Sequence, residues 1–349
     1  MLRLNQPVEK VNAMTCEREG LPTELSPEEL ERCVRSANLL NDVVFKYLFA
    51  TKGNEENLLR LLNDILAPER GIVSLQYLDR ENDPRRDEGR SSCVDVLARA
   101  EDGRVCHVEV QLGRAGYFFE RALYYASCSY SDQLSVSDSY DKLRPVIFVS
   151  ILNFCLFPDR AEDWRSLHRL LDVKEQRSYC DGMEFHFIEM PKLKRLAAAD
   201  RVEDVGLSRV MKYLGRIGGN AEMERLVECD RGIERLDDGV RTFFRKRGNL
   251  ALYRLRERAE TDYRSNLRFA VQEAMTEGES RGRDLGKAEG RAEGRAEGRT
   301  EGRAEGETQN RVETAQRMLG MKFTTEQISQ VTGLSLNEVE ALKDKAAGV

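Results

Sequence analysis

Two carboxylates and one amide in neighbouring strand-like runs are the residues of this chain best suited to chemistry. Asp95 lies in the run 94–100, and Glu109 and Gln111 lie in the run 105–111. Because strand side chains alternate between the two faces of a sheet, Glu109 and Gln111 share one face of their strand. The pairing register of the two runs decides whether Asp95 lies on that same face.

The loop between the two runs predicts their register. A two-residue loop would set Asp95 opposite Val110, whereas a three-residue loop, 101–103, sets Asp95 opposite Glu109. Three-residue hairpin loops favour glycine in their last, left-handed position, which here is Gly103. We therefore predict that Asp95 and Glu109 face each other. The valines of both strands then share the other face and are buried behind the pair: Val94, Val96, Val108 and Val110.

Carboxylates that face each other on paired strands have Cβ atoms about 5 Å apart. Like charges at that distance repel each other unless a divalent cation lies between them. Asp95 and Glu109 therefore indicate a Mg²⁺ site. The alternative is a solvated hairpin face on which Arg99 or Arg104 balances the charges. A carboxylate pair without basic neighbours would favour the metal.

The elements that position this hairpin follow from the spacing of apolar residues. These residues recur with helical spacing in some segments, and they alternate with polar residues or run continuously in others. Strands and helices interleave over the first half of the chain, which predicts an α/β or α+β sandwich of sheet and helices. The predicted helices are 37–52, 56–66 and 118–132, and the further predicted strands are 72–78, 146–157 and 183–189.

The hairpin resembles the PD-(D/E)XK nuclease superfamily, in which an Asp and a Glu-x-Lys lie on adjacent strands. The chain looks more specifically like the PD-(D/E)XK nuclease family transposases, similar to the recombination-promoting nucleases (Rpn), which have Glu-x-Gln. Val94 stands where the superfamily name has proline, and Gln111 stands where it has lysine. The resemblance implies a restriction-endonuclease-like α/β fold, with a central mixed sheet flanked by helices and a helical C-terminal extension. It also rests on NDVVFK at 41–46, the helix 56–66, RALYY at 121–125, the run 145–157, FIEMPK at 187–192, AETDYRS at 259–265 and the EG-rich tail.

This resemblance implies a Mg²⁺-dependent DNA endonuclease of the mobile-element or recombination type, with Mn²⁺ as a substitute ion. Asp95 and Glu109 would bind the metal together with the Val110 carbonyl, and Gln111 would position the attacking water. A lysine at position 111 would add a positive charge there, whereas glutamine offers hydrogen bonds alone. The alternative is a nuclease fold retained as a non-cleaving module that binds DNA or a protein. A third interpretation is an unrelated assembly protein built on the C-terminal repeat.

Further candidates lie on the predicted helices. Asp42 is a candidate for an additional catalytic acid, and its alternative role is an ion pair with Lys46 one turn later. Arg121 and Tyr125 are also one turn apart and are candidates for phosphate binding, or they belong to an ordinary amphipathic helix. His107 lies on the same strand face as Glu109, where we expect it to support the site rather than bind the metal.

Composition limits the classes of protein. The 349 residues suggest about two folded units. The 55 Lys and Arg against 61 Asp and Glu give a net charge of −6, so any DNA contact must use a local patch. Eight cysteines without C-x-x-C spacing, and no long apolar run, predict a cytoplasmic protein without a membrane span. The expected organisation is a flexible leader at 1–36, a nuclease-like domain at 37–199, a helical extension at 200–286, an EGRA repeat at 287–309 and a small helical unit at 310–349.

The EGRA repeat has a period of four residues. On a helix this period places Glu near Glu and Arg near Arg at i, i+4, and each glycine costs about 1 kcal/mol relative to alanine. The repeat is either a flexible spacer or a helix that packs on a partner chain, in which case the C-terminal region forms a homo-oligomer. The last unit resembles a helix-turn-helix, but its third helix, 336–345, carries acids as well as lysines. We expect a structural or assembly role for it in preference to DNA reading.

Overall fold

The computed structural model describes residues 23–66, 68–78, 95–114 and 116–347. They belong to two compact units, 1–264 and 265–349. The six strands are β1 (Leu75–Tyr77), β2 (Val96–Ala100), β3 (Val105–Gln111), β4 (Val146–Leu152), β5 (Arg165–Arg169) and β6 (Met183–Glu189). The α-helices of the first unit are α2 (Pro27–Ser36), α3 (Asp42–Ala50), α4 (Glu55–Ile65), α5 (Phe118–Ser131), α6 (Met190–Ala198), α7 (Gly206–Leu214), α8 (Gly219–Cys229) and α9 (Arg231–Arg245), with short 3₁₀ turns η1 (Pro68–Arg70) and η2 (Tyr140–Lys142). The rest is helical: α10 (Arg247–Gly320), α11 (Thr325–Thr332) and α12 (Leu336–Ala347).

The strands form one mixed sheet in the order β1-β2-β3-β4-β6-β5. β3, β4 and β6 are parallel to one another, while β1 with β2, β2 with β3, and β5 with β6 are antiparallel. β4 is buried along its whole length. This arrangement confirms the predicted α/β class with a central mixed sheet and flanking helices.

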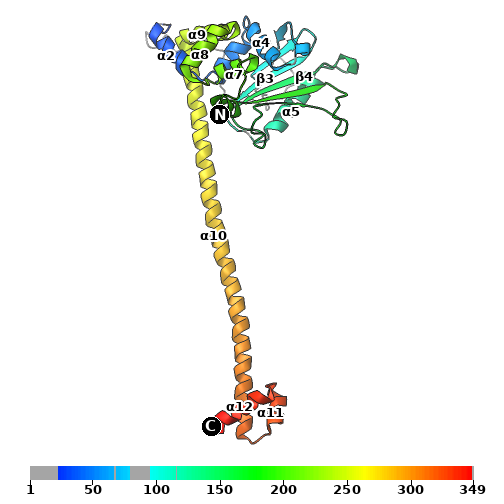
Figure 1. The fold of residues 1–349 in the computed structure, drawn as a ribbon, viewed down its shortest axis with the longest axis vertical. Coiled ribbons are helices and arrows are strands. Elements are labelled where there is room, and N and C mark those ends of the chain that lie inside the picture. The colour runs from blue at the N-terminus through cyan, green and yellow to red at the C-terminus, as the bar shows by residue number, and fades with distance from the viewer. Residues whose placement is uncertain (1–22, 67, 79–94, 115, 348–349) are drawn as a thin grey trace. The chain divides into compact units, whose positions relative to one another are not determined.

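Helices cover both faces of the sheet (Figure 1). On one face, side chains such as Val108 and Ile151 join a core that includes residues of α3, α4, α7 and α9. On the other face, Phe148 and Phe187 pack with Phe118 and Ala122 of α5. The sheet residues therefore alternate between two separate apolar layers, as strand geometry requires.

Two segments differ from the expectations. Residues 27–36, which we expected within a flexible leader, form α2 because Ser26 and Glu29 make a capping box at its start. α2 also buries Val34 in the main core. β5 was not predicted, since it is an edge strand of five residues with mostly exposed side chains. Val94 and the charged loop 80–92 lie outside the described residues.

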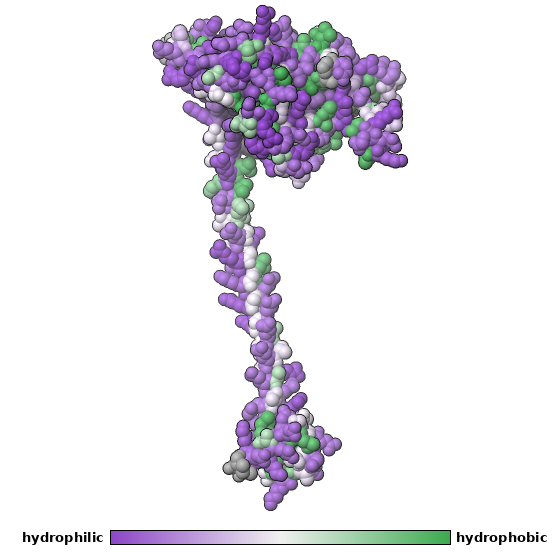
Figure 2. Space-filling model, viewed as in Figure 1, coloured by the Kyte–Doolittle hydropathy of each residue, from purple (hydrophilic) through white to green (hydrophobic). Residues whose placement is uncertain are grey.

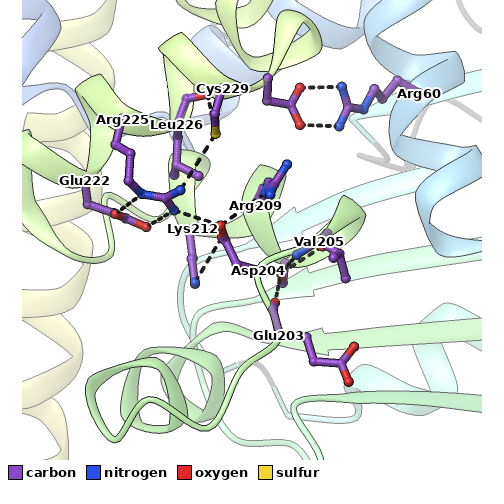
Figure 3. A network of polar contacts seen from close by, with 12 residues as sticks. Arg60, Glu203, Asp204, Val205, Arg209, Lys212, Glu222, Arg225, Leu226 and Cys229 are labelled. Atoms are coloured by element: carbon purple, nitrogen blue, oxygen red, sulfur yellow. Dashed lines mark hydrogen bonds and ion pairs between the residues drawn. The ribbon is translucent and has the colours of Figure 1, made fainter.

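An ion-pair network joins the loop before α7 to the helices around it (Figure 3). Asp204 lies 3.4 Å from Arg209, 3.5 Å from Lys212 and 3.0 Å from Arg225 of α8. These three cations lower the pKa of Asp204 even though burial raises it, with Arg225 contributing most. α7, α8 and α9 supply residues to the same core as the sheet, so the helices after residue 200 help to build the nuclease-like unit.

The repeat is helical and forms part of α10. Every residue from 261 to 311 is exposed, and hydrophilic residues predominate along the visible face of the helix (Figure 2). At the C-terminal end, residues from the end of α10 pack with α11 and α12 around a small core. That core contains Ala315, Ile328, Leu334 and Val339. Ser335 and Glu338 form a capping box at the start of α12.

None of the helices in the described part of the chain is both long and apolar enough to cross a membrane.

Candidate active site

The hairpin of β2 and β3 has the predicted register. Val96 pairs with Val108, and Ala98 pairs with Cys106. Gly103 has φ of +89°, and the Ala100 N–H donates to the Arg104 carbonyl at 2.9 Å, which closes a three-residue loop. Asp95 precedes β2 by one residue, so the same register continued would set it opposite Glu109, but its side chain contacts Lys46 of α3 whereas that of Glu109 contacts Arg121 of α5. Val96 and Val108 are buried in the main core, and Val110 packs partly buried against it.

Asp95 lies just before β2 with a side chain that is 7% exposed. Its Oδ2 accepts a hydrogen bond from the Val110 N–H at 2.8 Å, and its Oδ1 lies 3.3 Å from the Lys46 ammonium of α3. Burial raises the pKa of this carboxyl, and the negative charge of Asp42 raises it further, against the opposing effects of Lys46 and the Val110 N–H. A second positive charge near Asp95 would therefore be favourable.

Glu109 and Gln111 are held together by an arginine of α5. Arg121 Nη2 donates to Glu109 Oε1 at 2.8 Å and to Gln111 Oε1 at 2.7 Å. The amide of Gln111 also donates to the Gly113 carbonyl at 3.1 Å. Arg121 thus ties the two predicted catalytic side chains of β3 to the helix above them.

Asp42 begins α3, where Asn41 caps the helix. The partner that the structure shows for its carboxylate is Arg256 of α10, with both oxygens engaged at 2.9 Å. Asp42 is near enough to Asp95 to affect its pKa. The structure therefore brings Asp42 to the edge of the site, while Lys46 pairs with Asp95.

Two other sequence candidates lie further from the carboxylates. Tyr125 is half-buried and packs against the apolar layer beneath α5. His107 is buried, stacks on Phe148 at 5.3 Å and contacts the Ser129 hydroxyl at 2.7 Å. His107 therefore supports the packing of β3 against α5 and β4.

Sequence reasoning missed three neighbours of the site. Lys46 was considered as a partner of Asp42, and Arg121 as a phosphate ligand without its carboxylate partner. Ser150 of β4 pairs in register with Glu109, and its hydroxyl is buried without a hydrogen bond to any described residue. The available signal was that Ser150 interrupts the apolar run 146–157.

The basic neighbours differ from those considered for a solvated hairpin. Arg99 is exposed, and Arg104 instead pairs with Asp102 and donates to the carbonyls of Arg70 and Gly71. The cations beside the two carboxylates come from α3 and α5. Each of Asp95 and Glu109 therefore has a basic partner, contrary to the arrangement that would most favour a metal.

The donors of this site are two carboxylates on adjacent strands. Among the described residues, no group of three or more Asp, Glu, His or Cys side chains is arranged to hold a metal ion. Mg²⁺ usually takes one or two protein carboxylates and completes its shell with water and substrate phosphate oxygens. The chemical type of the donors at Asp95 and Glu109 therefore fits Mg²⁺. The buried Ser150 hydroxyl beside Glu109 offers one more polar group for a bound water.

The comparisons with known proteins agree with this architecture. Residues 39–270 match the model of the family described as PD-(D/E)XK nuclease family transposase, which covers the sheet, the hairpin and the first part of α10. No curated protein and no solved structure was found to match. Nucleases of this superfamily act on DNA and generally use divalent metals, which gives the chain a nuclease-like function. On this match and this fold, the chain belongs to the PD-(D/E)XK nuclease family transposases.

Proposed function

We propose that the protein is a Mg²⁺-dependent DNA endonuclease of the recombination-promoting nuclease type. The observation that supports this most is the register of the hairpin. Continued by one residue, this register would bring Asp95 opposite Glu109, and Gln111 shares the strand face of Glu109, in a chain of the nuclease family. In the reaction, a water oxygen bonds to phosphorus, one ester bond to a deoxyribose oxygen breaks, and that oxygen takes up a proton.

The metal-binding groups would be the Asp95 and Glu109 carboxylates and the Val110 carbonyl, with Mn²⁺ able to replace Mg²⁺. When bound, the ion supplies a Lewis acid and lowers the pKa of water. Gln111 accepts a hydrogen bond from Arg121 and donates one to Gly113, so its amide is held in place to orient a water. Its neutral side chain adds no charge to the site.

In this proposal, Lys46 of α3 supplies the positive charge that the neutral Gln111 lacks. Lys46 places its ammonium 3.3 Å from Asp95 while remaining 39% exposed. A lysine in that position can stabilise negative charge that develops on a phosphate close to Asp95. Lys46 thus does from α3 what a lysine at position 111 would do from β3.

The phosphate contacts are assigned to α5. Arg121 is 33% exposed on its side chain, so it can exchange part of its contact with Glu109 and Gln111 for a phosphate oxygen. Tyr125 is one turn away and would add its hydroxyl from the half-buried position described above. Asp42 would supply the additional acid once Arg256 turns to the DNA backbone.

Plasmid cleavage tests this proposal. Supercoiled DNA is incubated with the full chain and Mg²⁺, Mn²⁺ or EDTA, and Mg²⁺ binding is measured separately by calorimetry. The Asp95→Asn and Glu109→Gln variants should lose both cleavage and Mg²⁺ binding, whereas Asp141→Asn, a change at an exposed carboxylate, should keep both. Cleavage by both site variants at the wild-type rate would show that the active site lies elsewhere.

The second candidate is a non-cleaving module that binds DNA or a protein. It is favoured by the basic partners of both carboxylates, because Lys46 and Arg121 already compensate the charges that a metal would neutralise. This candidate predicts that the wild-type protein binds DNA equally well with EDTA and with Mg²⁺, and shows no heat of Mg²⁺ binding.

We also infer that the repeat assembles the protein into a parallel homo-oligomer. Successive residues on a helix are about 100° apart, so the Gly stripe of the repeat is flanked by Glu on one side and Arg on the other. Within one helix the repeat's opposite charges are spaced at i+2, where they do not meet. Of its arginines, Arg303 alone pairs with a carboxylate in the described chain, and that partner, Glu307, comes after the last Glu-Gly of the segment.

A second parallel copy packed on the Gly stripe would satisfy these charges. In a parallel pair, the Glu side of the stripe on one helix faces the Arg side of the stripe on the partner. Both edges of the contact therefore set Glu opposite Arg. An antiparallel pair would set Glu opposite Glu. Because four residues exceed the 3.6 of one helical turn, helices that follow this stripe would wind around each other in a right-handed supercoil.

Sedimentation of the full chain and of a chain without residues 287–349 tests the assembly. The shortened chain should form particles with fewer copies than the full chain does. It should keep measurable cleavage, because the proposed ligands all precede residue 126. An unchanged oligomeric state would contradict assembly through this region. Complete loss of cleavage with an intact fold would show that the tail contributes to the site.

We place the protein in the cytoplasm. The described cysteines, 33, 106, 128, 155, 180 and 229, are all free thiols, which is typical of reducing compartments.

A further inference from the structure

The flank of α5 that carries Arg121 also carries two exposed tyrosines. Tyr117 immediately precedes the helix, and Tyr124 follows Arg121 by three residues, so the three side chains lie on one side of α5. Tyr117 is 83% exposed and Tyr124 is 49% exposed. Large exposed aromatic residues in pairs indicate a surface that binds something flat and apolar.

This flank lies on the side of Glu109, one of the proposed metal ligands. The opposite flank of α5 carries Phe119, whose ring lies 5.6 Å from Phe187 of β6 and 5.9 Å from His168 of β5. Arg121 reaches in the other direction, to Glu109 of β3. Since β4 and β6 separate β3 from β5 in the sheet, the tyrosines lie toward β3.

Arg121, which lies between the two tyrosines in the sequence, has N–H groups that are available to a ligand. Arg121 uses Nη2 for its contacts to Glu109 and Gln111. Its Nη1 and Nε donate no hydrogen bond to the described part of the protein, although a guanidinium has five N–H groups. A phosphate that approaches from solvent can therefore bind Arg121 beside the rings.

Tyr117 has an uncommon backbone conformation. Its φ of 58° and ψ of 35° are left-handed, which L-residues other than Asn and Asp adopt rarely and at an energetic cost. This conformation turns the chain from β3 into α5 and leaves the phenol in solvent. A glycine would hold the same backbone without strain, so the side chain itself is what this position adds.

We propose that Tyr117 and Tyr124 stack on unpaired nucleobases of the DNA strand whose phosphate is bound at Arg121. The proposal rests on the nuclease function proposed above and specifies its substrate as single-stranded or locally unpaired DNA. Bases in a duplex stack on each other and expose only their edges, whereas unpaired bases present a flat face to aromatic side chains. The order Tyr117, Arg121, Tyr124 along one side of α5 matches the alternation of base and phosphate along a single strand.

The test uses the full chain with Ca²⁺ in place of Mg²⁺, and gel electrophoresis checks that the oligonucleotide stays uncut. A single-stranded oligonucleotide that contains 2-aminopurine reports stacking through quenching of its fluorescence, and the duplex of the same sequence is the comparison. Tyr117→Ala and Tyr124→Ala should each weaken binding of the single strand about tenfold and reduce the quenching. Their effect on the duplex should be small.

Three variants serve as controls. Tyr117→Phe and Tyr124→Phe keep the rings and should bind like the wild type. Tyr140→Ala removes an equally exposed tyrosine, 82% exposed, from η2 and should change nothing. Loss of binding in the Phe variants equal to that in the Ala variants would overturn stacking, because it would assign the effect to the hydroxyls.

The outcomes separate this proposal from the nuclease function. Unchanged single-strand affinity and quenching in both Ala variants, or tighter binding of the duplex than of the single strand, would overturn the stacking proposal. The Asp95→Asn cleavage result would stand in either case. Tyrosine-dependent quenching in a protein that cleaves nothing would support the stacking surface and reject the nuclease. If the Ala variants instead lose only a bound protein, the surface is a protein interface and the proposal is wrong.

Discussion

Two buried carboxylate clusters, one around Glu184 of β6 and one around Asp95 just before β2, differ in how far their charge is compensated. Glu184 of β6 contacts three basic side chains: Arg70, Arg169 at 3.0 Å and His186 at 2.5 Å. Asp95 has the Lys46 ammonium at 3.3 Å, and a second carboxylate, Asp42, acts against it.

The pKa values of the two groups move in opposite directions as a result. Burial raises the pKa of Glu184, but His186 and Arg70 outweigh burial and leave it at about 2. Burial raises the pKa of Asp95, and Lys46 does not reverse that. A carboxylate with excess positive charge around it stabilises the fold, whereas an undercompensated one favours the approach of another cation.

The largest expected effect is at Asp95. Asp95→Asn should reduce cleavage by about a thousandfold, because it removes one of the two proposed carboxylate ligands of the metal. The free energy of unfolding should stay the same or rise, since the charge that is lost is unfavourably buried. Plasmid cleavage and urea unfolding of the same preparation measure both quantities. A destabilised Asp95→Asn protein would mean that this carboxylate is structural.

Glu184→Gln should show the reverse pattern. It leaves Arg70, Arg169 and His186 without their shared anion and should lower the free energy of unfolding by about 3 kcal/mol. Cleavage at a temperature where the variant is folded should remain within a few-fold of wild type. Urea unfolding at pH 7 is the measurement, and Asp141→Asn is again the neutral control. A stable but inactive Glu184→Gln protein would show that Glu184 is needed for cleavage and not for the fold, contrary to this comparison.

Wild type and Glu184→Gln should also differ in how their free energy of unfolding depends on pH. The folded pKa of Glu184 is about 2 against an ordinary 4.5, so its stabilising effect is complete above pH 4.5 and is lost as the pH falls toward 2. The stability difference between wild type and Glu184→Gln should therefore shrink by about 2 kcal/mol from pH 5 to pH 3. Urea titrations at both pH values measure it. A constant difference would indicate that Glu184 acts through packing instead of charge.

The smallest effect is expected at Gln111. Gln111→Ala should slow cleavage by about tenfold, because a water can replace most of the hydrogen bonds of the amide. Arg121 should keep its contact with Glu109 in this variant. Single-turnover cleavage at saturating Mg²⁺ measures the change. A loss as large as that of Asp95→Asn would show that Gln111 is as necessary as the metal ligands.

Local sequence patterns predicted the hairpin that carries the site. The position of Gly103 and the alternation of valines fix a three-residue loop, and the structure has the pairing that follows from them. The strand and helix types around the hairpin were also predictable, because their apolar periodicity is local. The bounds moved by a few residues, as for β4, which ends at Leu152.

The partners of the site residues could not be predicted in the same way. Lys46 is 49 positions before Asp95, and Arg256 is 214 positions after Asp42. Such contacts depend on how α3 and α10 pack against the sheet, and no spacing rule encodes that packing. The edge strand β5 was missed for a related reason, since a short strand with one buried residue has no clear period.

The ion pair between Asp42 and Arg256 determines where an active fragment of this protein can end. Every proposed metal ligand lies between residues 95 and 110, yet Asp42 depends on a side chain in the first turns of α10. Tyr253 of α10 is also buried, and its hydroxyl accepts a hydrogen bond from the Asn38 N–H at 2.9 Å. A chain cut before residue 256 would leave the Asp42 carboxylate without Arg256 near Asp95. Expression boundaries should therefore be drawn beyond Arg256, and ahead of Val34, whatever is done with the repeat.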